Sequence, residues 1–202
     1  MSDRREESAR AHLSALAEVL TRSADEIPAR AAAYAGLVIE TFERDGRVLM
    51  CGNGGSAATV EHVATEYVVR LKRERAPLPA IALTAGSAQL TASANDFGYE
   101  RAFLRMLCAF GRRGDLLVLH STSGESANLL AAAAEAERMG IGTVGLLGHG
   151  GGRLAELVDL QIRVPSSDTA LIQEVHLAIE HAVADMVDAH FADRRKNPEK
   201  AE

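Results

Sequence analysis

The chain opens with two helical patterns before any strand pattern begins. Apolar residues recur at helical spacing from Ser8 to Leu20, which predicts one amphipathic helix with a charged outer face. The motif Ser23-Ala24-Asp25-Glu26 has the form of a capping box, and Pro28 follows it in the first turn of a second predicted helix that ends near Asp45. A helical pair alone cannot bury both of its apolar faces, so we expect this extension to pack on the rest of the chain or on a second copy.

After the extension, short apolar runs alternate with longer helical segments. The runs predict strands at Val48–Cys51, Pro79–Thr84, Asp115–Leu119, Thr143–Leu147 and Leu160–Val164. The segments predict helices at Ala57–Arg70, Ser87–Ala94, Glu100–Phe110, Ser126–Met139 and Arg153–Leu157, with a long final helix from about Thr169 to Phe191. Since these segments suit right-handed crossovers, we expect an α/β fold with a doubly wound, five-stranded parallel sheet of the flavodoxin-like kind. We divide the chain into an N-terminal helical extension (1–45), an α/β domain (46–192) and a charged tail (193–202).

Composition narrows the possible functions. The 202 residues are 47% hydrophobic and can bury one sizeable core, while the net charge of −6 supplies no basic field for nucleic acid. Cys51 and Cys108 lie in apolar runs without metal or redox spacing, so we expect both to be reduced core residues. No apolar run has the length of a membrane helix and the first residues are not signal-like, which favours a cytoplasmic protein without a membrane partner.

A glycine-rich turn follows the first predicted strand. Gly52-Asn53-Gly54-Gly55-Ser56-Ala57 fits the dinucleotide pattern G-x-G-x-x-A between a strand and a helix. The second strand, however, ends in Thr84-Ala85-Gly86 instead of the acidic residue that would bind a ribose, which disfavours a dinucleotide. We expect the backbone N–H groups and the Asn53 and Ser56 side chains to hold sugar hydroxyls; a bare strand-to-helix turn is the alternative.

A hydroxyl-rich segment, Ser121-Thr122-Ser123-Gly124-Glu125-Ser126, links the third predicted strand to the next helix. Hydroxyls and free N–H groups at a helix N-terminus can hold a phosphate without a lysine. A Ser/Thr-rich cap is also common without a ligand. Because this segment and the glycine-rich turn lie at the same edge of one sheet, and no Walker motif is present, we favour a sugar phosphate.

Histidine and carboxylate residues recur on two helices. His62 and Glu66 are four residues apart on one helix face and could bind a metal or divide acid and base work, although a surface contact is the alternative. On the final helix, Gln173 and His181 are about 12 Å apart along the axis, so one of them could act across a subunit boundary. We expect His176 to be a core residue. Asn95-Asp96-Phe97-Gly98 predicts either a turn after a short helix or, through Asp96, a contact with a sugar hydroxyl.

Together these motifs resemble the phosphoheptose isomerase family, the sedoheptulose 7-phosphate isomerases with a sugar-isomerase (SIS) domain. The resemblance covers nearly the whole chain and implies a homotetramer with sugar phosphate bound between subunits. It implies zinc at His62, Glu66, Gln173 and His181, and phosphate at Ser121, Thr122, Ser123 and Ser126. It places Asn53, Gly54, Gly55, Ser56, Asn95 and Asp96 around the sugar, and Arg70 matches a family arginine that points at the substrate, although a surface charge is the alternative.

The resemblance further implies ketose–aldose isomerisation through an enediol. Such a reaction needs a base at the carbon next to the carbonyl and an acid or metal at the carbonyl oxygen, for which we select Glu66 and His181. Leu171 stands where many members would have arginine, which leaves the exact sugar open. The alternatives are a non-catalytic adaptor for a protein partner such as the replication initiator, which the acid/base pair disfavours, and a sugar-phosphate sensor, which the lack of a DNA-binding module disfavours.

Overall fold

The computed structural model describes residues 2–196, except for the side chains of residue 2 and residues 193–196. Its five strands form one parallel sheet in the order β2-β1-β3-β4-β5, which is the flavodoxin-like order and confirms the predicted fold class. The strands are β1 (Val48–Gly52), β2 (Ala80–Ala82), β3 (Leu116–Ser121), β4 (Gly142–Leu147) and β5 (Leu160–Arg163).

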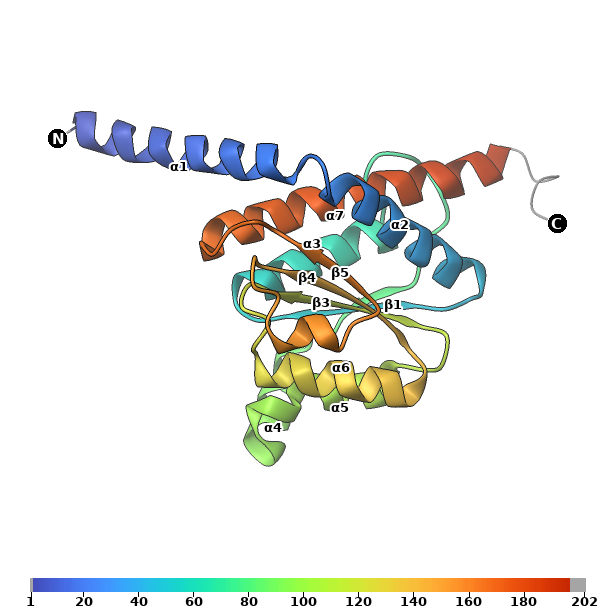
Figure 1. The fold of residues 1–202 in the computed structure, drawn as a ribbon. Helices are drawn as coiled ribbons and strands as arrows, with labels where there is room; N and C mark the ends of the chain where they lie inside the picture. The colour runs from blue at the N-terminus through green and yellow to red at the C-terminus, as the bar shows by residue number, and fades with distance from the viewer. Residues whose placement is uncertain (1, 197–202) are drawn as a thin grey trace.

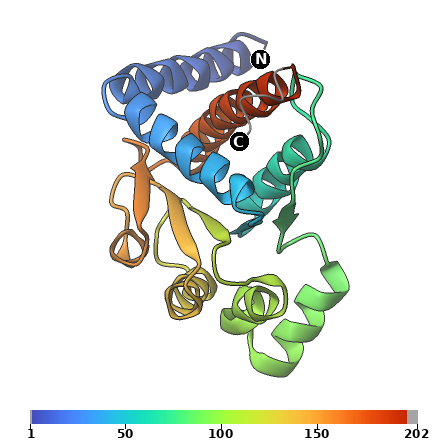
Figure 2. The same cartoon turned by 90° about the vertical axis from the view of Figure 1, so that its right-hand side faces the viewer.

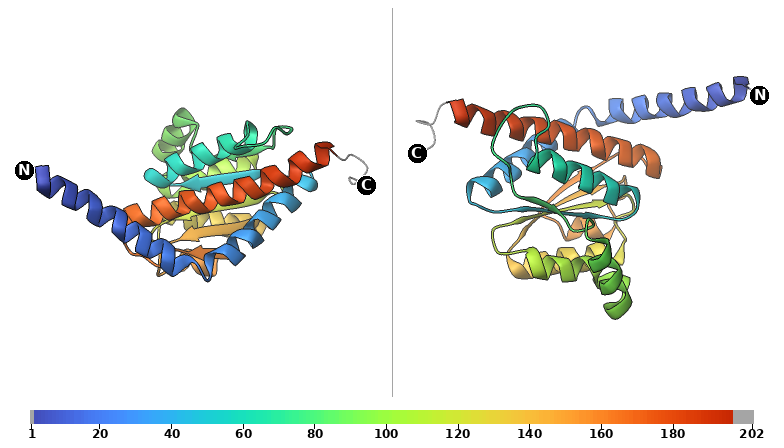
Figure 3. Two further views of the ribbon diagram at one scale, coloured as in Figure 1. Left: turned by 90° about the horizontal axis from the view of Figure 1, so that it is seen from above. Right: turned by 180° about the vertical axis from the view of Figure 1, so that it is seen from behind.

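Helices cover both faces of this sheet (Figures 1 and 2). One face carries α2 (Ile27–Glu43), α3 (Gly55–Val68) and α7 (Thr169–Lys196), and α1 (Ser2–Ser23) precedes them. The other face carries α4 (Ser87–Phe97), α5 (Ala102–Phe110), α6 (Ala127–Met139) and the short turns η1 (Tyr99–Arg101) and η2 (Arg153–Glu156). Seen from above, α7 crosses the sheet with α2 on one side and α3 on the other (Figure 3, left).

Alternate residues of each central strand enter two separate cores. Val48, Met50 and Val118 pack under α2, α3 and α7, whereas Leu49 and Leu117 pack against α5 and α6. Because both faces are covered, every residue of β1 and β3 is buried, and these strands therefore read as continuous apolar runs. The sheet thus holds the carboxyl ends of β1 and β3 in a fixed position.

Helix α1 extends away from the body of the molecule (Figures 1 and 3). Val19 is buried, but Leu13 is 65% exposed and Leu20 is 43% exposed. Within the described residues, the apolar stripe of α1 is therefore largely uncovered in a single chain. Among all the residues that the structure describes, no helix combines the length and hydropathy needed to cross a bilayer.

Three local predictions are wrong. The capping box does not form, because α1 continues through Ser23, whose hydroxyl donates to the Val19 carbonyl, and Glu26 makes no side-chain cap at the start of α2. Cys51 is buried as predicted, but Cys108 is exposed on the outer side of the amphipathic helix α5. Asn95 and Asp96 lie inside the last turn of α4 and not in a turn after it. Residues 197–202 of the predicted tail lie outside the described residues.

Candidate active site

The glycine-rich turn and the hydroxyl-rich segment start side by side. Strands β1 and β3 are hydrogen-bonded neighbours, and Gly52 at the end of β1 is in register with His120 near the end of β3. The turn that follows β1 leads into α3, and the segment that follows β3 leads into α6. Both loops therefore lie at the carboxyl edge of the sheet, where open α/β sheets bind their ligands.

The glycine-rich turn is tightly built, and its asparagine is held by two side chains from other elements. A Cβ on Gly52 would lie 2.8 Å from the Ser56 Cβ, which explains the glycine at this position. The Asn53 amide exchanges two hydrogen bonds with the amide of Asn128, at 2.8 and 3.0 Å, and its oxygen also accepts the Tyr99 hydroxyl at 2.8 Å. Asn53 thus holds Tyr99 over the turn and keeps one N–H for a ligand. Neither partner, Asn128 or Tyr99, was predicted from the sequence.

The hydroxyl-rich segment folds around its own serines. The Ser121 hydroxyl oxygen accepts the Gly124 N–H at 2.9 Å, and that of Ser123 accepts the Glu125 N–H at 3.2 Å. Each hydroxyl uses its oxygen in this way and keeps its hydrogen to donate. Ser126 is the N-cap of α6 and makes no side-chain capping bond. The segment therefore presents O–H donors at a helix N-terminus, the arrangement that suits a phosphate.

A second loop supports this segment from outside. Gly124 has a positive φ of 70°, and a Cβ there would collide with the Gly151 carbonyl. The Arg153 backbone N–H and side chain donate to the Glu125 carboxylate at 2.9 and 2.7 Å, and these bonds lower the Glu125 pKa. The loop after β4 thus fixes the shape of the hydroxyl-rich segment.

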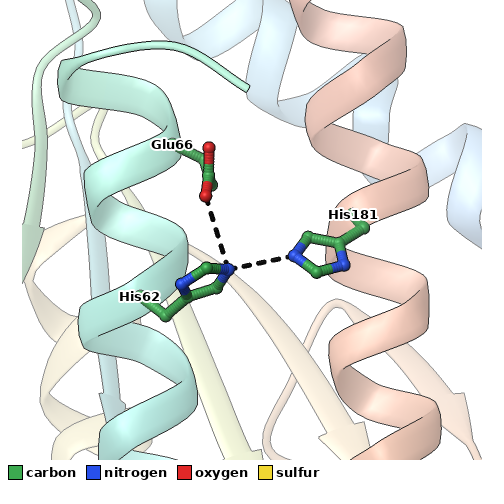
Figure 4. A group of neighbouring side chains, drawn as sticks. All are labelled: His62, Glu66 and His181. Atoms are coloured by element: carbon green, nitrogen blue, oxygen red, sulfur yellow. Dashed lines mark hydrogen bonds and ion pairs between the residues drawn. The ribbon is translucent and has the colours of Figure 1, made fainter. Parts of the chain in front are cut away.

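Three ionisable side chains from two helices converge on one another, about two helical turns beyond the glycine-rich turn at which α3 begins (Figure 4). His62 and Glu66 lie one turn apart on α3, and His181 faces them from α7. The Nε2 atoms of His62 and His181 are 3.0 Å apart, and the His62 Nε2 is 3.4 Å from a Glu66 carboxylate oxygen. One ligand atom from each residue falls within 4.8 Å of the others. We call these residues the His-Glu-His cluster.

The chemistry of the cluster follows from its donors and burial. Two imidazoles and a carboxylate are a ligand set for a divalent transition metal, and the spacing of their atoms fits one ion. The Glu66 side chain is only 15% exposed, whereas that of His62 is 47% exposed, so a carboxylate in a partly desolvated position faces imidazoles at an open surface. The same groups can transfer protons to and from a bound molecule.

Gln173 lies at the opposite end of the same helix pair. A Cβ on Gly55 would meet the Gln173 side-chain oxygen at 2.5 Å, so this amide packs against the start of α3. Gly55 precedes His62 by about two turns of α3, and Gln173 precedes His181 by about two turns of α7. Because α3 and α7 run side by side in the same direction, these two pairs lie at matching positions along the helices. Gln173 therefore lies at the glycine-rich turn, about two helical turns from the cluster.

The remaining predicted residues are exposed. Arg70 lies just beyond the end of α3, and its side chain is open to solvent. Asn95 and Asp96 are bonded to each other at 2.9 Å on α4, which lies on the opposite face of the sheet from α7 (Figure 1). A single chain does not bring these residues to the His-Glu-His cluster.

One buried polar group, two of whose members adjoin site residues in the sequence, was not predicted from the sequence. Glu180 of α7 is fully buried beside His120 of β3 and Tyr34 of α2. The expected core residue His176 is 1% exposed, as predicted, and burial together with His120 lowers its pKa to about 3, so this imidazole is neutral. The sequence feature that could have indicated the buried group is His120, a histidine near the end of the otherwise apolar strand β3.

Comparison with known proteins gives consistent matches. A family model described as "SIS domain" matches residues 10–148. A phosphoheptose isomerase of a Roseiflexus species is 52% identical over 156 residues, 77% of this chain and 79% of the relative, and one from Rhodospirillum rubrum is 46% identical over 91% of this chain and 97% of the relative. The solved structure of the Neisseria gonorrhoeae phosphoheptose isomerase is 35% identical, with a TM-score of 0.87 over 91% of this chain and 98% of that chain. That of Francisella tularensis is 33% identical, with a TM-score of 0.88 over 92% and 98%.

Proposed function

Because the chain belongs to the phosphoheptose isomerase family of SIS-domain proteins, we propose that it interconverts sedoheptulose 7-phosphate and D-glycero-D-manno-heptose 7-phosphate through an enediol. The observation that carries this proposal is the convergence of Glu66 and His181 on His62, from helices far apart in the sequence, in a chain whose β3–α6 segment presents hydroxyls at a helix N-terminus. The phosphate anchors one end of an open-chain sugar, and the carbonyl end reaches the cluster.

Each proton transfer is assigned to a group in the site. The Glu66 carboxylate removes a proton from C1 of the ketose while His181 donates a proton to the C2 carbonyl oxygen, which gives the neutral enediol. Glu66 then returns a proton to C2 while His181 takes the proton from the C1 oxygen, which yields the aldose and restores both groups. Such positioned acid–base pairs contribute about 10²- to 10⁴-fold to a rate. The partial burial of Glu66 keeps water away from the base.

We propose zinc as the metal of this site. His62, Glu66 and His181 would hold the ion, since one ligand atom from each lies within 4.8 Å of the others. Bound zinc would polarise the substrate carbonyl as a Lewis acid in place of the proton from His181, whose Nε2 would then be a ligand. Gln173, which the family resemblance places among the ligands, contacts Gly55, and we propose that it serves the sugar from there.

The remaining substrate contacts are assigned as follows. We propose that Ser121, Thr122, Ser123 and Ser126 hold the phosphate. We propose that Asn53, Gly54 and Gly55 contact sugar hydroxyls through backbone N–H groups and the free Asn53 side-chain N–H, and that Ser56, whose own N–H donates to the Asn53 carbonyl, does so through its hydroxyl. Arg70, Asn95 and Asp96 are proposed as substrate contacts on the family resemblance alone. Both described cysteines are free thiols, which agrees with a reducing compartment, and we propose a cytoplasmic enzyme.

We propose further that the enzyme is a homotetramer assembled through α1. An apolar cleft of about 380 Å³ lies where α1 and α2 meet α7, and Leu20, Ile27, Val175 and Ile179 are among its lining residues. The exposed stripe of α1 continues from this cleft. A second copy offers the matching surface, because the partner's own α1 carries the same uncovered stripe.

The test is direct incubation of the purified protein with sedoheptulose 7-phosphate. We expect an aldose 7-phosphate to form until equilibrium is reached, with exchange of one carbon-bound hydrogen in deuterated water. Absence of both product and exchange, in protein that has been supplied with zinc, would contradict the proposed function. Metal analysis of protein purified without chelator tests zinc separately, and a stoichiometry near zero that added zinc does not raise would contradict the metal assignment.

A further inference from the structure

Glu180 stands at the centre of a buried hydrogen-bonded group. Its carboxylate accepts the Tyr34 hydroxyl at 3.2 Å and the His120 Nε2–H at 2.7 Å, and all three side chains are at most 1% exposed. Tyr34 comes from α2, His120 from β3 and Glu180 from α7, so the group joins three separate elements. We call these three residues the Tyr-His-Glu group.

Stability alone does not account for this group. Removing a carboxylate and an imidazole from water is costly, and well-packed apolar residues of similar volume are often as stable or more stable in such a place. The group lies in the apolar layer that includes Val175 and Ile179 of the same helix, and two further buried polar side chains, Tyr67 and His176, lie beside it. Hydrogen bonds have a required direction and apolar contacts do not, so the group supplies α7 with an orientation that packing alone leaves loose.

The position of Glu180 in the sequence links this orientation to the site. Successive residues on an α-helix point about 100° apart. With Glu180 directed at α2 and the sheet, His181 is directed at α3, where its Nε2 lies 3.0 Å from that of His62. A rotation of α7 by about 10° would move the tip of such a side chain by about 1 Å. A misplacement of that size costs up to about 100-fold in rate.

The other end of the group meets the proposed phosphate site. His120 directly precedes Ser121, whose hydroxyl holds the Gly124 N–H in the hydroxyl-rich segment. Hydrogen bonds therefore run from Tyr34 through Glu180 to His120. Glu180 is next to His181 of the cluster, and His120 is next to Ser121 of the hydroxyl-rich segment. This set of bonds fixes the distance between the phosphate position and His181.

We propose that the Tyr-His-Glu group consists of positioning residues, which set the rotation of α7 and thereby hold His181 at the distance from the phosphate that the isomerisation needs. This inference rests on the proposed isomerase function. Tyr34, His120 and Glu180 do not contact the substrate themselves. Their effect is on kcat, through geometry, and not on folding.

The test separates geometry from stability by replacing the whole group with apolar side chains. In the triple variant Tyr34→Phe, His120→Leu and Glu180→Leu, no buried polar atom of the group is left without a partner, so we expect the melting temperature to stay within a few degrees of the wild type. We expect kcat to fall about 10- to 100-fold. A triple variant that folds normally and keeps the wild-type kcat would overturn the proposal.

Conservative variants supply the second readout. In Glu180→Gln the amide can still accept from Tyr34 and can donate to the other tautomer of His120, so geometry is kept and kcat should remain within about threefold of the wild type. A larger loss would contradict a purely positional role. If the triple variant fails to fold, Tyr34→Phe decides, because it removes one hydroxyl only; a drop of a few fold in kcat at constant KM supports the proposal, and an unchanged kcat overturns it.

A remote control and the wild type complete the design. Thr143 of β4 is a buried hydroxyl bonded to Asp159 at 2.9 Å, away from the site. Thr143→Val should lower the melting temperature and leave kcat unchanged. The wild type is assayed first with sedoheptulose 7-phosphate, so an inactive wild type marks failure of the proposed function, whereas an active wild type with an unaffected triple variant marks failure of this inference alone.

Discussion

Replacing Asp188 with alanine should be among the most damaging single changes in the molecule. One oxygen of this buried carboxylate accepts the backbone N–H groups of Leu71, Lys72 and Arg73 at 2.9–3.1 Å, and the other accepts the Arg75 guanidinium at 2.7 Å. Arg75 is itself buried and also donates to the carbonyls of Glu66, Tyr67 and Ala76. Asp188 therefore connects α7 to the whole segment that follows α3.

The magnitude follows from the charge left behind. Asp188→Ala leaves the Arg75 guanidinium buried without a counter-charge, a change that costs about 3–5 kcal/mol. For a chain of this size, each kcal/mol lowers the melting temperature by about 2–4 °C, so we expect a fall of about 6–20 °C. Differential scanning calorimetry or circular dichroism at pH 7 measures it.

The matched control is Asp185→Ala, one turn earlier on the same helix. Asp185 pairs with Lys72 and Arg73 at the surface, where an ion pair contributes about 0–1 kcal/mol. We expect its melting temperature to change by no more than about 4 °C. Equal effects of the two substitutions, or a fall below 2 °C for Asp188→Ala, would refute the reasoning.

Acidic pH should weaken the contact between Asp188 and the segment that follows α3. Burial opposes ionisation of Asp188, but the N–H groups of Lys72 and Arg73 and the Arg75 side chain outweigh it and lower the pKa from its ordinary value of 3.8. Because the folded-state pKa is lowered, the stabilisation is fully present above pH 3.8 and is lost as the pH falls through the folded-state value.

Three further predictions concern the site and its surroundings. Ser121→Ala removes a proposed phosphate donor worth about 1.5–3 kcal/mol, so KM should rise at least about 10-fold in steady-state assays; an unchanged KM would exclude Ser121 from phosphate binding. The hydrogen bond and charge of Glu174 raise the His12 pKa above 6.5, so this contact supports α1 below pH 6.5 and is lost as the pH rises through the raised value; NMR titration should show the pKa falling in Glu174→Gln, and no change would contradict the contact. Leu13→Glu with Leu20→Glu should reduce the proposed tetramer to smaller species in light-scattering measurements, and a tetrameric variant would contradict assembly through α1.

The strand pattern was a reliable guide to the fold for a physical reason. Strands covered on both faces, such as β1 and β3, read as short unbroken apolar runs, and the helices between them leave few topologies open. The local errors have equally simple causes. The pattern Ser-x-x-Glu indicates a cap, but Ser23 bonds back to Val19 and the helix continues. Cys108 lies in an apolar run that proves to be one side of an amphipathic helix.

The candidate site was predictable only in part. Sequence motifs placed His62, Glu66 and His181 on two helices, and the sheet topology explains why such helices can meet. The pairings of Tyr99 with Asn53 and of His120 with Glu180 join residues 46 and 60 positions apart, and no periodicity carries information about such contacts. The same is true of Gln173, whose neighbour Gly55 becomes evident only when α3 and α7 lie side by side.

The most direct test of the account is a comparison of Glu66→Gln with the wild-type enzyme in the same preparation. The substitution keeps the size of the side chain and removes its ability to take a proton from carbon. We predict that turnover of sedoheptulose 7-phosphate falls at least about 100-fold, while binding of the sugar phosphate, measured by isothermal titration calorimetry, stays within a few fold. A variant with wild-type turnover would show that this carboxylate is not the base, and would contradict the central claim.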